Sequence, residues 1–376
     1  MVNTRDNSRK HVPSVHPRGL RLLLQQLVDI YSPTGKEEDI LEFVHEYLAK
    51  RELPVIRQAV DDNRYNLLVL PPDTDALVVF VGHLDTVAAY DLEEYEYREE
   101  NQVVYGLGTA DMKSGCAALI EAFLSVWETG ASGIPAALAL VVGEEEDGDG
   151  AEALVREYHF PWAVIAEPTD LQVCLSHYGY VELQLLTKGK RMHASLANRD
   201  QNPIDAMLRL LLEFSTYADE TRTGLVYNIR DLYSPPAGFV VPDQCEVWID
   251  LHLPPDAPIG EITMELEDIV QAYRERVRQL DITLRFTTIQ AGYEIPEKGP
   301  LVKILKDLYR DNACPWIPQA FRSHSDANIL WEAGIKPIIL GPGRLTSAHA
   351  PDESVEFADV AKAANLYAAL MAALGT

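Results

Sequence analysis

Three short apolar runs, each followed at once by residues that can bind a metal or move a proton, constrain the fold of this chain most strongly. They are Ala76–Gly82, Ala136–Val142 and Trp162–Ala166. Continuous apolar runs of this length are typical of strands that are buried on both faces of a sheet. Segments with helical spacing of apolar residues alternate with them, at 19–31, 40–50, 117–128 and 151–158. The sequence therefore predicts an α/β domain whose sheet is covered by helices on both faces.

The middle of the chain has a different pattern. Strand-like and helical segments follow one another there in the order strand, helix, strand, helix, strand, which predicts a smaller α+β domain. A chain of 376 residues is also long enough for about two domains. We predict a larger domain formed by residues 18–178 and 292–376, interrupted by a smaller one at 179–291. Residues 1–17 are polar and basic, and we predict a flexible lead without the apolar centre of a secretory signal.

Charge and composition exclude several classes of partner. The formal net charge of -26 disfavours nucleic acid and anionic membranes. No apolar stretch approaches the roughly 20 residues needed to cross a bilayer. The cysteines are widely spaced, with no CxxC pair, at Cys116, Cys174, Cys245 and Cys314. We therefore expect a cytoplasmic protein with free thiols, and neither a disulfide framework nor a cysteine-based zinc site.

Residues with ligand chemistry appear in two of the predicted loops. His83 and Asp85 belong to VGHLDTV and follow the first buried strand, where ligands gather in open α/β sheets. In H-x-D, the imidazole can bind zinc while the carboxylate orients it. Asp111 lies in the glycine-rich loop GLGTADMKSG, where one carboxylate can bridge two metals. This loop lacks the GKS or GKT ending of a phosphate-binding loop.

Further acids and a histidine follow the other strands. Glu144, Glu145 and Glu146 come directly after the second buried strand, Glu167 follows the third, and His349 lies in the loop GPGRLTSAHAPDE. Adjacent glutamates at a strand end point in different directions, so one can bind metal while its neighbour takes a proton from water. Each residue alone would be an ordinary polar loop residue. Together, two histidines and three carboxylates match a dinuclear zinc site with a bridging acid and an open position for water.

The motifs HLDTV, GxGxxDMKxG, EEE, EPT and the late loop histidine together resemble the dinuclear-zinc exopeptidase and deacylase family. Acetylornithine deacetylase, succinyl-diaminopimelate desuccinylase, peptidase T, glutamate carboxypeptidase and the carrier-protein-lysine hydrolases belong to it. The resemblance covers nearly the whole chain from about residue 20. It implies a zinc-binding α/β domain with an inserted dimerisation or lid domain. It also implies a homodimer that uses two Zn²⁺, or Co²⁺ or Mn²⁺ in their place, to cut an amide bond beside an amino acid.

The same resemblance implies a role for each metal ligand. His83 and Glu167 would hold one zinc, and His349 with a glutamate of the triplet would hold the other. Asp111 would bridge the two ions, and Asp85 would orient His83. In the resulting reaction, the zinc ions bind and polarise a water and the substrate carbonyl.

The glutamate triplet allows two registers. The segment EEDGDGA resembles the pattern of peptidase T-like members when Glu145 is the base and Glu146 the ligand, which is our prediction. A shift of one residue would make Glu144 the base and Glu145 the ligand. The segment RMHAS places His193 where the family has a histidine that reaches across the dimer to stabilise the oxyanion.

Substrate contacts are expected around FRSHSDANILWEAG, which resembles the T-S-D-x-N segment of acetylornithine deacetylase and lysine hydrolase relatives. Asn328 is therefore a predicted substrate contact, while His324 stands where a small Thr is more usual. Arginine binds carboxylates through a bidentate fork. Arg230 and Arg322, with Arg344 as a further candidate, are predicted to bind the α-carboxylate of the substrate.

We predict an enzyme that releases an amino acid such as lysine or ornithine from its N-acyl or carrier-linked form. The carrier protein of such relatives is acidic, and the basic stretch Lys188, Lys190, Arg191 and Arg199 would dock it. Two alternatives remain open. A di- or tripeptidase would use the same metals, with a spare carboxylate near S-D-A-N for a free amine. A metal-binding scaffold would bind the ions without catalysis.

Overall fold

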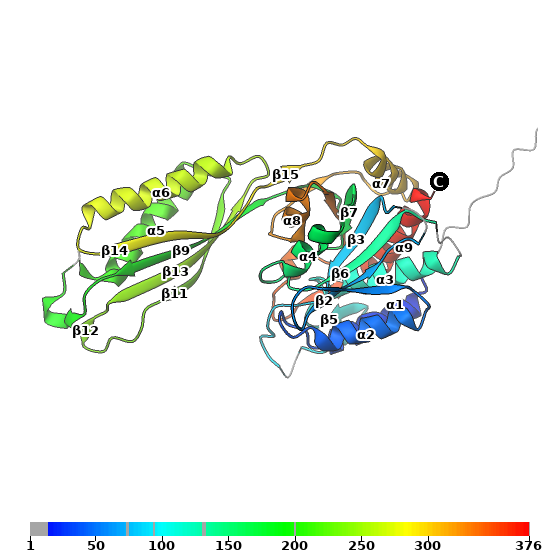
Figure 1. The fold of residues 1–376 in the computed structure, drawn as a ribbon, viewed down its shortest axis with the longest axis horizontal. Helices are drawn as coiled ribbons and strands as arrows, with labels where there is room; N and C mark the ends of the chain where they lie inside the picture. Colours follow the sequence, from blue (N-terminus) through cyan, green and yellow to red (C-terminus); the bar gives the residue numbers. More distant parts are fainter. Residues whose placement is uncertain (1–13, 73–74, 93–94, 130–132, 199–200, 376) are drawn as a thin grey trace, which may run out of the picture. The chain divides into compact units, whose positions relative to one another are not determined.

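The fold of the chain is shown by a computed structural model that describes residues 14–72, 75–92, 95–129, 133–198 and 201–375 (Figure 1). The chain divides into two compact units. The first consists of Met1–Leu175, Ile295–Gln319 and Ser325–Thr376, and the second of Ser176–Glu294 and Ala320–His324. The predicted inserted segment, 179–291, lies within the second unit. Most of the predicted lead at residues 1–17 lies outside the described residues.

Parallel strands form the centre of the sheet in the first unit. They lie in the order β6 (Ala136–Val141), β3 (Val78–His83), β7 (Trp162–Ile165) and β17 (Lys336–Ile339). Every residue of β6, β3 and β7 is buried, as the apolar runs predicted. The hairpin strands β1 (Val55–Ala59) and β2 (Tyr65–Val69) extend the sheet beside β6. Because neighbouring parallel strands end at one edge, the loops that follow them meet there.

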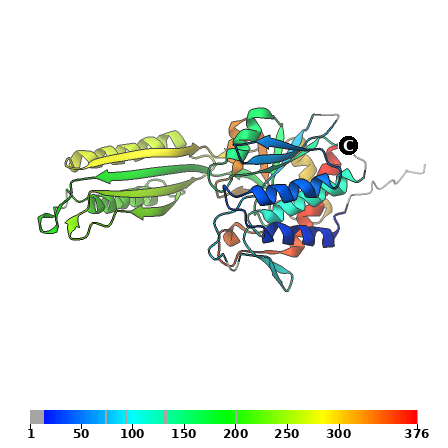
Figure 2. The ribbon, with the colours of Figure 1, turned by 60° about the horizontal axis from the view of Figure 1, so that its bottom comes forward.

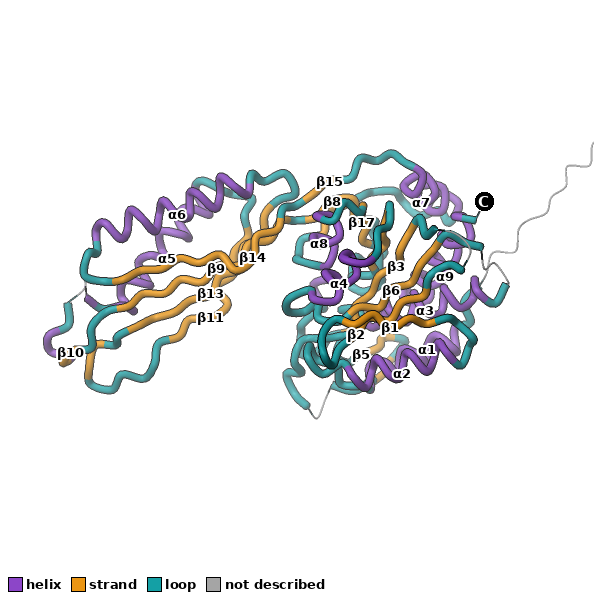
Figure 3. Tube along the Cα trace, viewed as in Figure 1, coloured by secondary structure: helices purple, strands orange, loops and turns teal. Residues whose placement is uncertain are grey.

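Helices cover both faces of this sheet, which confirms the predicted fold class (Figure 3). On one face α3 (Lys113–Trp127) packs on β3 and contacts α1 (Pro17–Asp29) and α9 (Phe357–Leu374), and α7 (Pro300–Asp311) packs on α9. The other face carries α4 (Asp149–Glu157) and α8 (Asp326–Glu332). The helix α2 (Glu38–Ala49) contacts β1 and β2. By length and composition α9 could cross a membrane, but its apolar residues pack in this core.

Short strands connect the loops around the sheet edge. A three-stranded sheet has the order β18 (Ser354–Glu356), β5 (Val103–Tyr105) and β4 (Arg98–Glu100). Two glycines let three segments meet at the end of β7. A Cβ on Gly115 would lie 2.3 Å from the carbonyl oxygen of Ala166, and one on Gly341 would lie 2.2 Å from the same oxygen. Only glycine fits at these two positions, because any side chain would overlap that oxygen.

The second unit is a four-stranded antiparallel sheet with two helices on one face (Figures 1 and 2). Its strand order is β11 (Val226–Tyr233), β13 (Gln244–Leu253), β9 (Gly179–Lys188) and β14 (Asp281–Gln290). The helices are α5 (Pro203–Glu220) and α6 (Ile259–Arg276). The edge strand β11 was not predicted, because most of its side chains are exposed and lack the alternation of a half-buried strand.

Smaller strands complete the second unit. The strands β10 (Met192–His193) and β12 (Val240–Val241) form a separate two-stranded pair. The strands β8 (Cys174–His177), β15 (Tyr293–Glu294) and β16 (Gln319–Phe321) belong instead to the larger sheet, in which β8 pairs with β17 and both β15 and β16 pair with β8.

Candidate metal centre

The edge at which β6, β3 and β7 end gathers six side chains with ligand chemistry. His83 is the last residue of β3, which lies between β6 and β7 in the sheet. The other residues come from the loops that follow β6, β7 and β17 and from the loop before α3. The six are His83, Asp111, Glu144, Glu145, Glu167 and His349. The structure therefore brings together five of the predicted strand-end residues, with Glu144 as the sixth.

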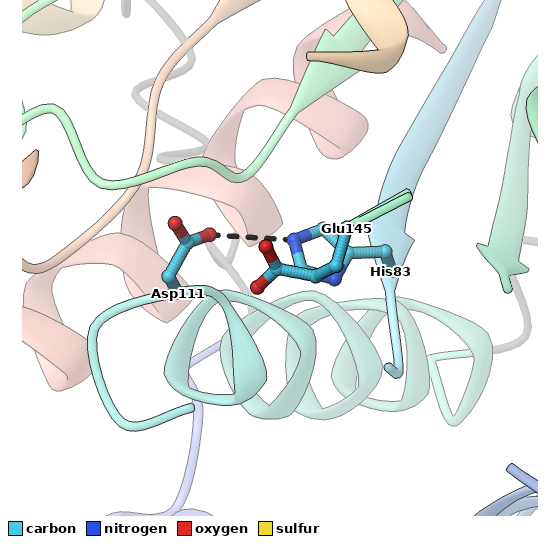
Figure 4. Close-up of side chains that lie close together, drawn as sticks. All are labelled: His83, Asp111 and Glu145. Carbon is cyan, nitrogen blue, oxygen red and sulfur yellow. Dashed lines mark hydrogen bonds and ion pairs between the residues drawn. The ribbon is translucent and has the colours of Figure 1, made fainter. Parts of the chain in front are cut away.

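His83 is the buried centre of this group (Figure 4). Its Nε2 lies 3.3 Å from Asp111 Oδ1, 3.7 Å from Glu144 Oε2 and 3.8 Å from Glu167 Oε1. Its Nδ1 lies 3.0 Å from the backbone oxygen of Asp85. A carbonyl oxygen can only accept, so Nδ1–H donates and Nε2 is the nitrogen that faces the carboxylates. A metal ion that replaced the proton on Nε2 would find the ring already oriented by the bond from Nδ1.

Asp111 lies between two histidines. Its Oδ1 faces His83, while its Oδ2 lies 3.6 Å from His349 Nε2. The same nitrogen of His349 lies 3.0 Å from Glu145 Oε2. His349 is half-exposed and has a backbone φ of 56°, a conformation that few non-glycine residues adopt. Each oxygen of Asp111 thus faces a different imidazole, as a carboxylate that bridges two metal ions requires.

Asp85 is fully buried and ties the loops together. It accepts hydrogen bonds from the backbone amides of Glu144 at 3.3 Å and Glu145 at 3.0 Å, and from Thr34 Oγ1 at 2.8 Å. Its Oδ1 also lies 3.5 Å from His83 Nδ1. Asp85 therefore holds the two glutamates, while the predicted role of its carboxylate in orienting His83 stays a prediction. Thr34 was not among the predicted site residues.

Glu146, the predicted ligand, lies outside the group. It is exposed and lines a surface cavity of about 310 Å³ together with Arg64 and Asp149. The chain turns at Gly143, whose carbonyl accepts from the amide of Gly148, and the amides of the first two glutamates bind Asp85. The third glutamate therefore points to solvent. The register shifted by one residue, with Glu144 and Glu145 at the site, fits this placement.

The electrostatics of the group show an excess of negative charge. Burial raises the pKa of Glu144 and of Glu167 well above the ordinary value. Burial alone would lower the pKa of His83, but the neighbouring Glu144 and Asp111 outweigh it and raise that pKa well above its usual range. The hydrogen bond to Glu145 raises the pKa of His349 to about 9. Every imidazole here is surrounded by groups that favour a positive charge.

The residues fit a pair of metal ions. Two donors on one tetrahedral zinc lie about 3.3 Å apart when each metal–ligand bond is about 2.0 Å. The donor pairs described above span 3.0 to 3.8 Å, which brackets this value. Glu167 Oε1 is buried and has no hydrogen-bond partner among the described residues, so it is available to a cation. Imidazole nitrogens and carboxylate oxygens are also the donors that zinc accepts.

Residues 79–373 match peptidase family M20/M25/M40. The chain belongs to this family. It is therefore a metal-dependent hydrolase of the class that contains deacetylases, desuccinylases and peptidases, which confirms the predicted enzyme class. Membership of this family argues against the alternative of a metal-binding scaffold without catalysis.

Named members of the M20/M25/M40 class resemble the chain along most of its length. It is 24% identical over 318 residues to acetylornithine deacetylase of Buchnera aphidicola subsp. Schizaphis graminum, covering 80% of this chain and 81% of the relative. A putative [LysW]-lysine/[LysW]-ornithine hydrolase of Pyrobaculum aerophilum is 25% identical, covering 91% and 94%. A tripeptidase structure from Staphylococcus aureus subsp. aureus Mu50 superposes with a TM-score of 0.79 at 19% identity, covering 96% and 99%.

Two residues of this M20/M25/M40 chain that prediction missed lie beside the metal centre. Glu353 is buried, and its carboxylate accepts hydrogen bonds from the loop that carries Asp111. Its signal in the sequence was its place four residues after His349, in the H-x-P-x-E part of the loop. Asp326, in the first turn of α8, is buried, and its Oδ1 has no hydrogen-bond partner among the described residues. Burial raises the pKa of Asp326 to about 7.

The predicted substrate contacts of the first unit have local partners. Asn328 is buried in α8, where its Oδ1 accepts from the amide of Ser325 at 3.5 Å as part of a capping box. Arg344 is exposed and forms an ion pair with Asp170 at 3.3 Å. A role in substrate binding stays a prediction for both. The capping contact shows why Asn328 suits this helix start independently of any substrate.

The other predicted contacts belong to the second unit and are described within it. His193 is exposed at the end of β10, with Nδ1 2.8 Å from Ser195 Oγ. Arg230 forms an ion pair with Glu182 at 2.9 Å, and Arg322 is exposed. Their roles at the active site stay predictions.

Proposed function

We propose that the protein hydrolyses the amide bond of an N-acyl amino acid with two zinc ions held on either side of Asp111. The observation that carries this proposal is the carboxylate of Asp111, whose two oxygens face two different histidines. His83 and Glu167 would hold one ion, and Glu145 and His349 the other. When bound, the ions supply a water with a pKa near 7 and polarise the substrate carbonyl.

Glu144 is the proposed general base. Its carboxylate lies within ligand distance of His83 and Glu167, but the proposed ligand sets, with Asp111 shared, have three protein ligands each without it. Burial raises its pKa well above the ordinary value, and a raised pKa suits a group that takes a proton near neutral pH. Glu144 would remove a proton from the attacking water and pass it to the leaving amine. Asp85 holds the base in place through its backbone amide.

His193 is the proposed oxyanion-stabilising residue, supplied by the partner subunit of a homodimer. The edge strand β11 supports such a dimer because it pairs with β13 alone among the described strands. It exposes Val226, Ile229 and Leu232, and an exposed apolar edge is a surface on which a second chain pairs. Light scattering of the purified protein should give twice the mass of one chain. A monomer that hydrolyses the substrate at full rate would remove the role of His193.

An N-acyl form of ornithine or lysine is the proposed substrate, supported by the likeness to acetylornithine deacetylase and to the [LysW]-lysine/[LysW]-ornithine hydrolase. Zinc-loaded protein should be assayed against N-acetyl-ornithine, N-acetyl-lysine, N-succinyl-diaminopimelate, a dipeptide and a tripeptide. We expect the highest kcat/KM for an N-acyl ornithine or lysine. A preference for unblocked peptides would overturn this choice while leaving the metal chemistry intact.

A carrier-linked substrate would place a second protein on the second unit. Lys188, Lys190 and Arg191 are exposed there, and Arg199 lies outside the described residues. An acidic carrier would be attracted to this stretch, although the whole chain at -26 repels it. Changing all four residues to Ser should slow hydrolysis of the carrier-linked substrate and spare N-acetyl amino acids. Equal loss on both substrates would show that the stretch does not dock a carrier.

Peptide hydrolysis is the second candidate, and Asp326 is the observation that favours it. A buried carboxylate without a hydrogen-bond partner on one oxygen provides the counter-charge that a free α-amine needs. A structure described as a tripeptidase has the same fold, with a TM-score of 0.79. Asp326→Asn should then lower kcat/KM for a dipeptide far more than for an N-acetyl amino acid. Equal effects on both substrates would show that Asp326 does not bind a free α-amine.

A further inference from the structure

The carboxylate of Glu353 is fully occupied by backbone amides of one loop. Its Oε1 accepts from the amides of Ala110 at 2.7 Å and Asp111 at 2.9 Å, and its Oε2 accepts from the amide of Gly108 at 2.8 Å. Hydrogen bonds to an ionised acceptor are about twice as strong as those between neutral groups. Glu353 is 4% exposed, so these three bonds stabilise a carboxylate that would otherwise be buried at a high cost.

The backbone around Glu353 joins the same two loops. The amide of Gly106 donates to the carbonyl of Glu353 at 3.2 Å. The next residues form β18, which pairs with β5 through Ser354 opposite Tyr105 and Val355 opposite Val104. The loop from β5 to Asp111 and the loop from His349 to β18 are therefore fixed to each other by a strand pair and, at its end, by one carboxylate.

We propose that Glu353 is a positioning residue that sets the separation of Asp111 from His349. It thereby sets the geometry of the metal position that Glu145 and His349 would hold. His349 lies four residues before Glu353, and Asp111 itself donates one of the three amides. Loss of the carboxylate leaves the two loops joined by the strand pair and by the backbone bond from Gly106 to Glu353, neither of which involves an amide next to Asp111. Glu353 is not one of the residues grouped as possible metal ligands, and its carboxylate accepts three backbone amides instead. The inference rests on the proposed two-zinc function and adds a residue to it.

The main test is the zinc affinity of Glu353→Gln. Glutamine keeps one acceptor oxygen and replaces the other with an NH₂ group, which cannot accept from an amide such as that of Gly108. Residues that support metal ligands from behind typically change metal affinity by about 10- to 100-fold when replaced. We expect the weaker of two zinc dissociation constants, measured by competition with a chelator, to rise by about this factor. The stronger constant should change less, and kcat should fall with KM nearly unchanged.

Val355→Ala is the matched control. Val355 is buried in β18, two residues after Glu353, and carries no polar group, so its truncation weakens packing of the strand without touching the carboxylate. We expect this variant to lower the melting temperature while both zinc dissociation constants stay within about twofold of the wild type. If Val355→Ala weakens zinc binding as much as Glu353→Gln at the same loss of melting temperature, Glu353 has only a structural role and the proposal is overturned.

Hydrogen exchange in the metal-free wild type tests the hydrogen bonds of the Glu353 carboxylate without any variant. The amides of Gly108, Ala110 and Asp111 should exchange slowly, since each is bonded to a buried carboxylate. Rapid exchange of all three would overturn the proposal even if Glu353→Gln failed to fold. If the wild type binds no zinc, the proposed function is wrong. If the wild type binds zinc and Glu353→Gln binds it equally well, only the positioning role of Glu353 is wrong.

Discussion

Two pairs of buried or half-buried histidines have opposite surroundings. His83 and His349, in the first unit, lie among carboxylates that raise the pKa of both, that of His349 to about 9. His177 and His324, in the second unit, have pKa values that burial lowers to about 3 and about 4. The first pair attracts a cation, and the second pair stays neutral at physiological pH. The same residue type therefore lies in a candidate metal site in one region and in packing contacts in the other.

Aromatic neighbours replace carboxylates around the second pair. The ring of His177 stacks on Tyr293 with centroids 5.5 Å apart, and that of His324 lies 4.7 Å from Tyr180. His324 Nε2 also contacts Gln290 Oε1 at 2.7 Å. The difference shows that a histidine in this chain becomes a candidate ligand only where acids from several strand ends converge on it.

Metal removal should have the largest effect, and it should act on the first pair of histidines alone. With the ions stripped by a chelator, activity should fall to the background rate, because no other described group replaces the positive charge among the carboxylates. Restoring zinc at about 100 times its dissociation constant should stabilise the first unit by about 2.7 kcal/mol for each site filled. Calorimetry with and without zinc measures this gain. Undiminished activity in protein shown by elemental analysis to hold no metal would contradict a metal-dependent mechanism.

Glu144→Gln should have the next largest effect. Loss of a general base lowers kcat by about 10²- to 10⁴-fold, while two zinc ions should remain bound because the residue is not a ligand. Kinetics combined with elemental analysis of the variant separate these roles. A variant that loses zinc along with activity would move Glu144 into the ligand set.

Acidification should act on the other pair of histidines. The pKa of His177 is about 3 in the folded chain, against 6.5 for an unperturbed histidine. Between these values the unfolded chain binds more protons, so stability rises with pH and is lost as pH falls below about 6.5. From pH 7 to 5 this loss is about 2 kcal/mol for a histidine with that shift.

The variant His177→Phe isolates that contribution. Phenylalanine keeps an aromatic ring beside Tyr293 but cannot titrate, so the variant should lose about 2 kcal/mol less than the wild type between pH 7 and 5. Denaturant unfolding at both pH values gives the difference directly. Any hydrogen bond lost with the imidazole lowers stability at both pH values and cancels. Equal pH dependence in the two proteins would show that His177 takes up its proton without unfolding.

The smallest effect is expected for Glu146→Gln. Its side chain is exposed and lies outside the metal group, so kcat/KM and zinc content should stay within about twofold of the wild type. This variant is the matched control for Glu144→Gln, since the two residues belong to one run of glutamates. A large loss of zinc would restore the register with Glu146 as the ligand.

The ligand positions could be predicted from sequence because each depends on a local signal. An apolar run marks a buried strand, and the polar residue after it must lie at the common edge of a parallel sheet. His83 and Glu167 were found in this way. The choice within the glutamate run depends on Asp85, whose carboxylate binds two amides some 60 residues further along the chain. No local pattern carries that information.

Two further features were out of reach for the same physical reason. Glu353 binds amides more than 240 residues earlier in the chain, and only the folded loops bring them together. The edge strand β11 exposes most of its side chains, so its residues lack the two-residue periodicity that reveals a half-buried strand. Sequence patterns report burial of one element at a time, whereas these features depend on pairing between distant segments.

The two glycines that meet the carbonyl of Ala166 also determine how this protein can change. Every missense change of a single nucleotide in a glycine codon introduces a Cβ, and a Cβ on Gly115 or Gly341 would overlap that oxygen. The displaced segments would be the start of α3, which follows Asp111, and the loop that leads to His349. Random mutagenesis under selection for activity should therefore return glycine at both positions, while position 146 accumulates amino-acid substitutions freely.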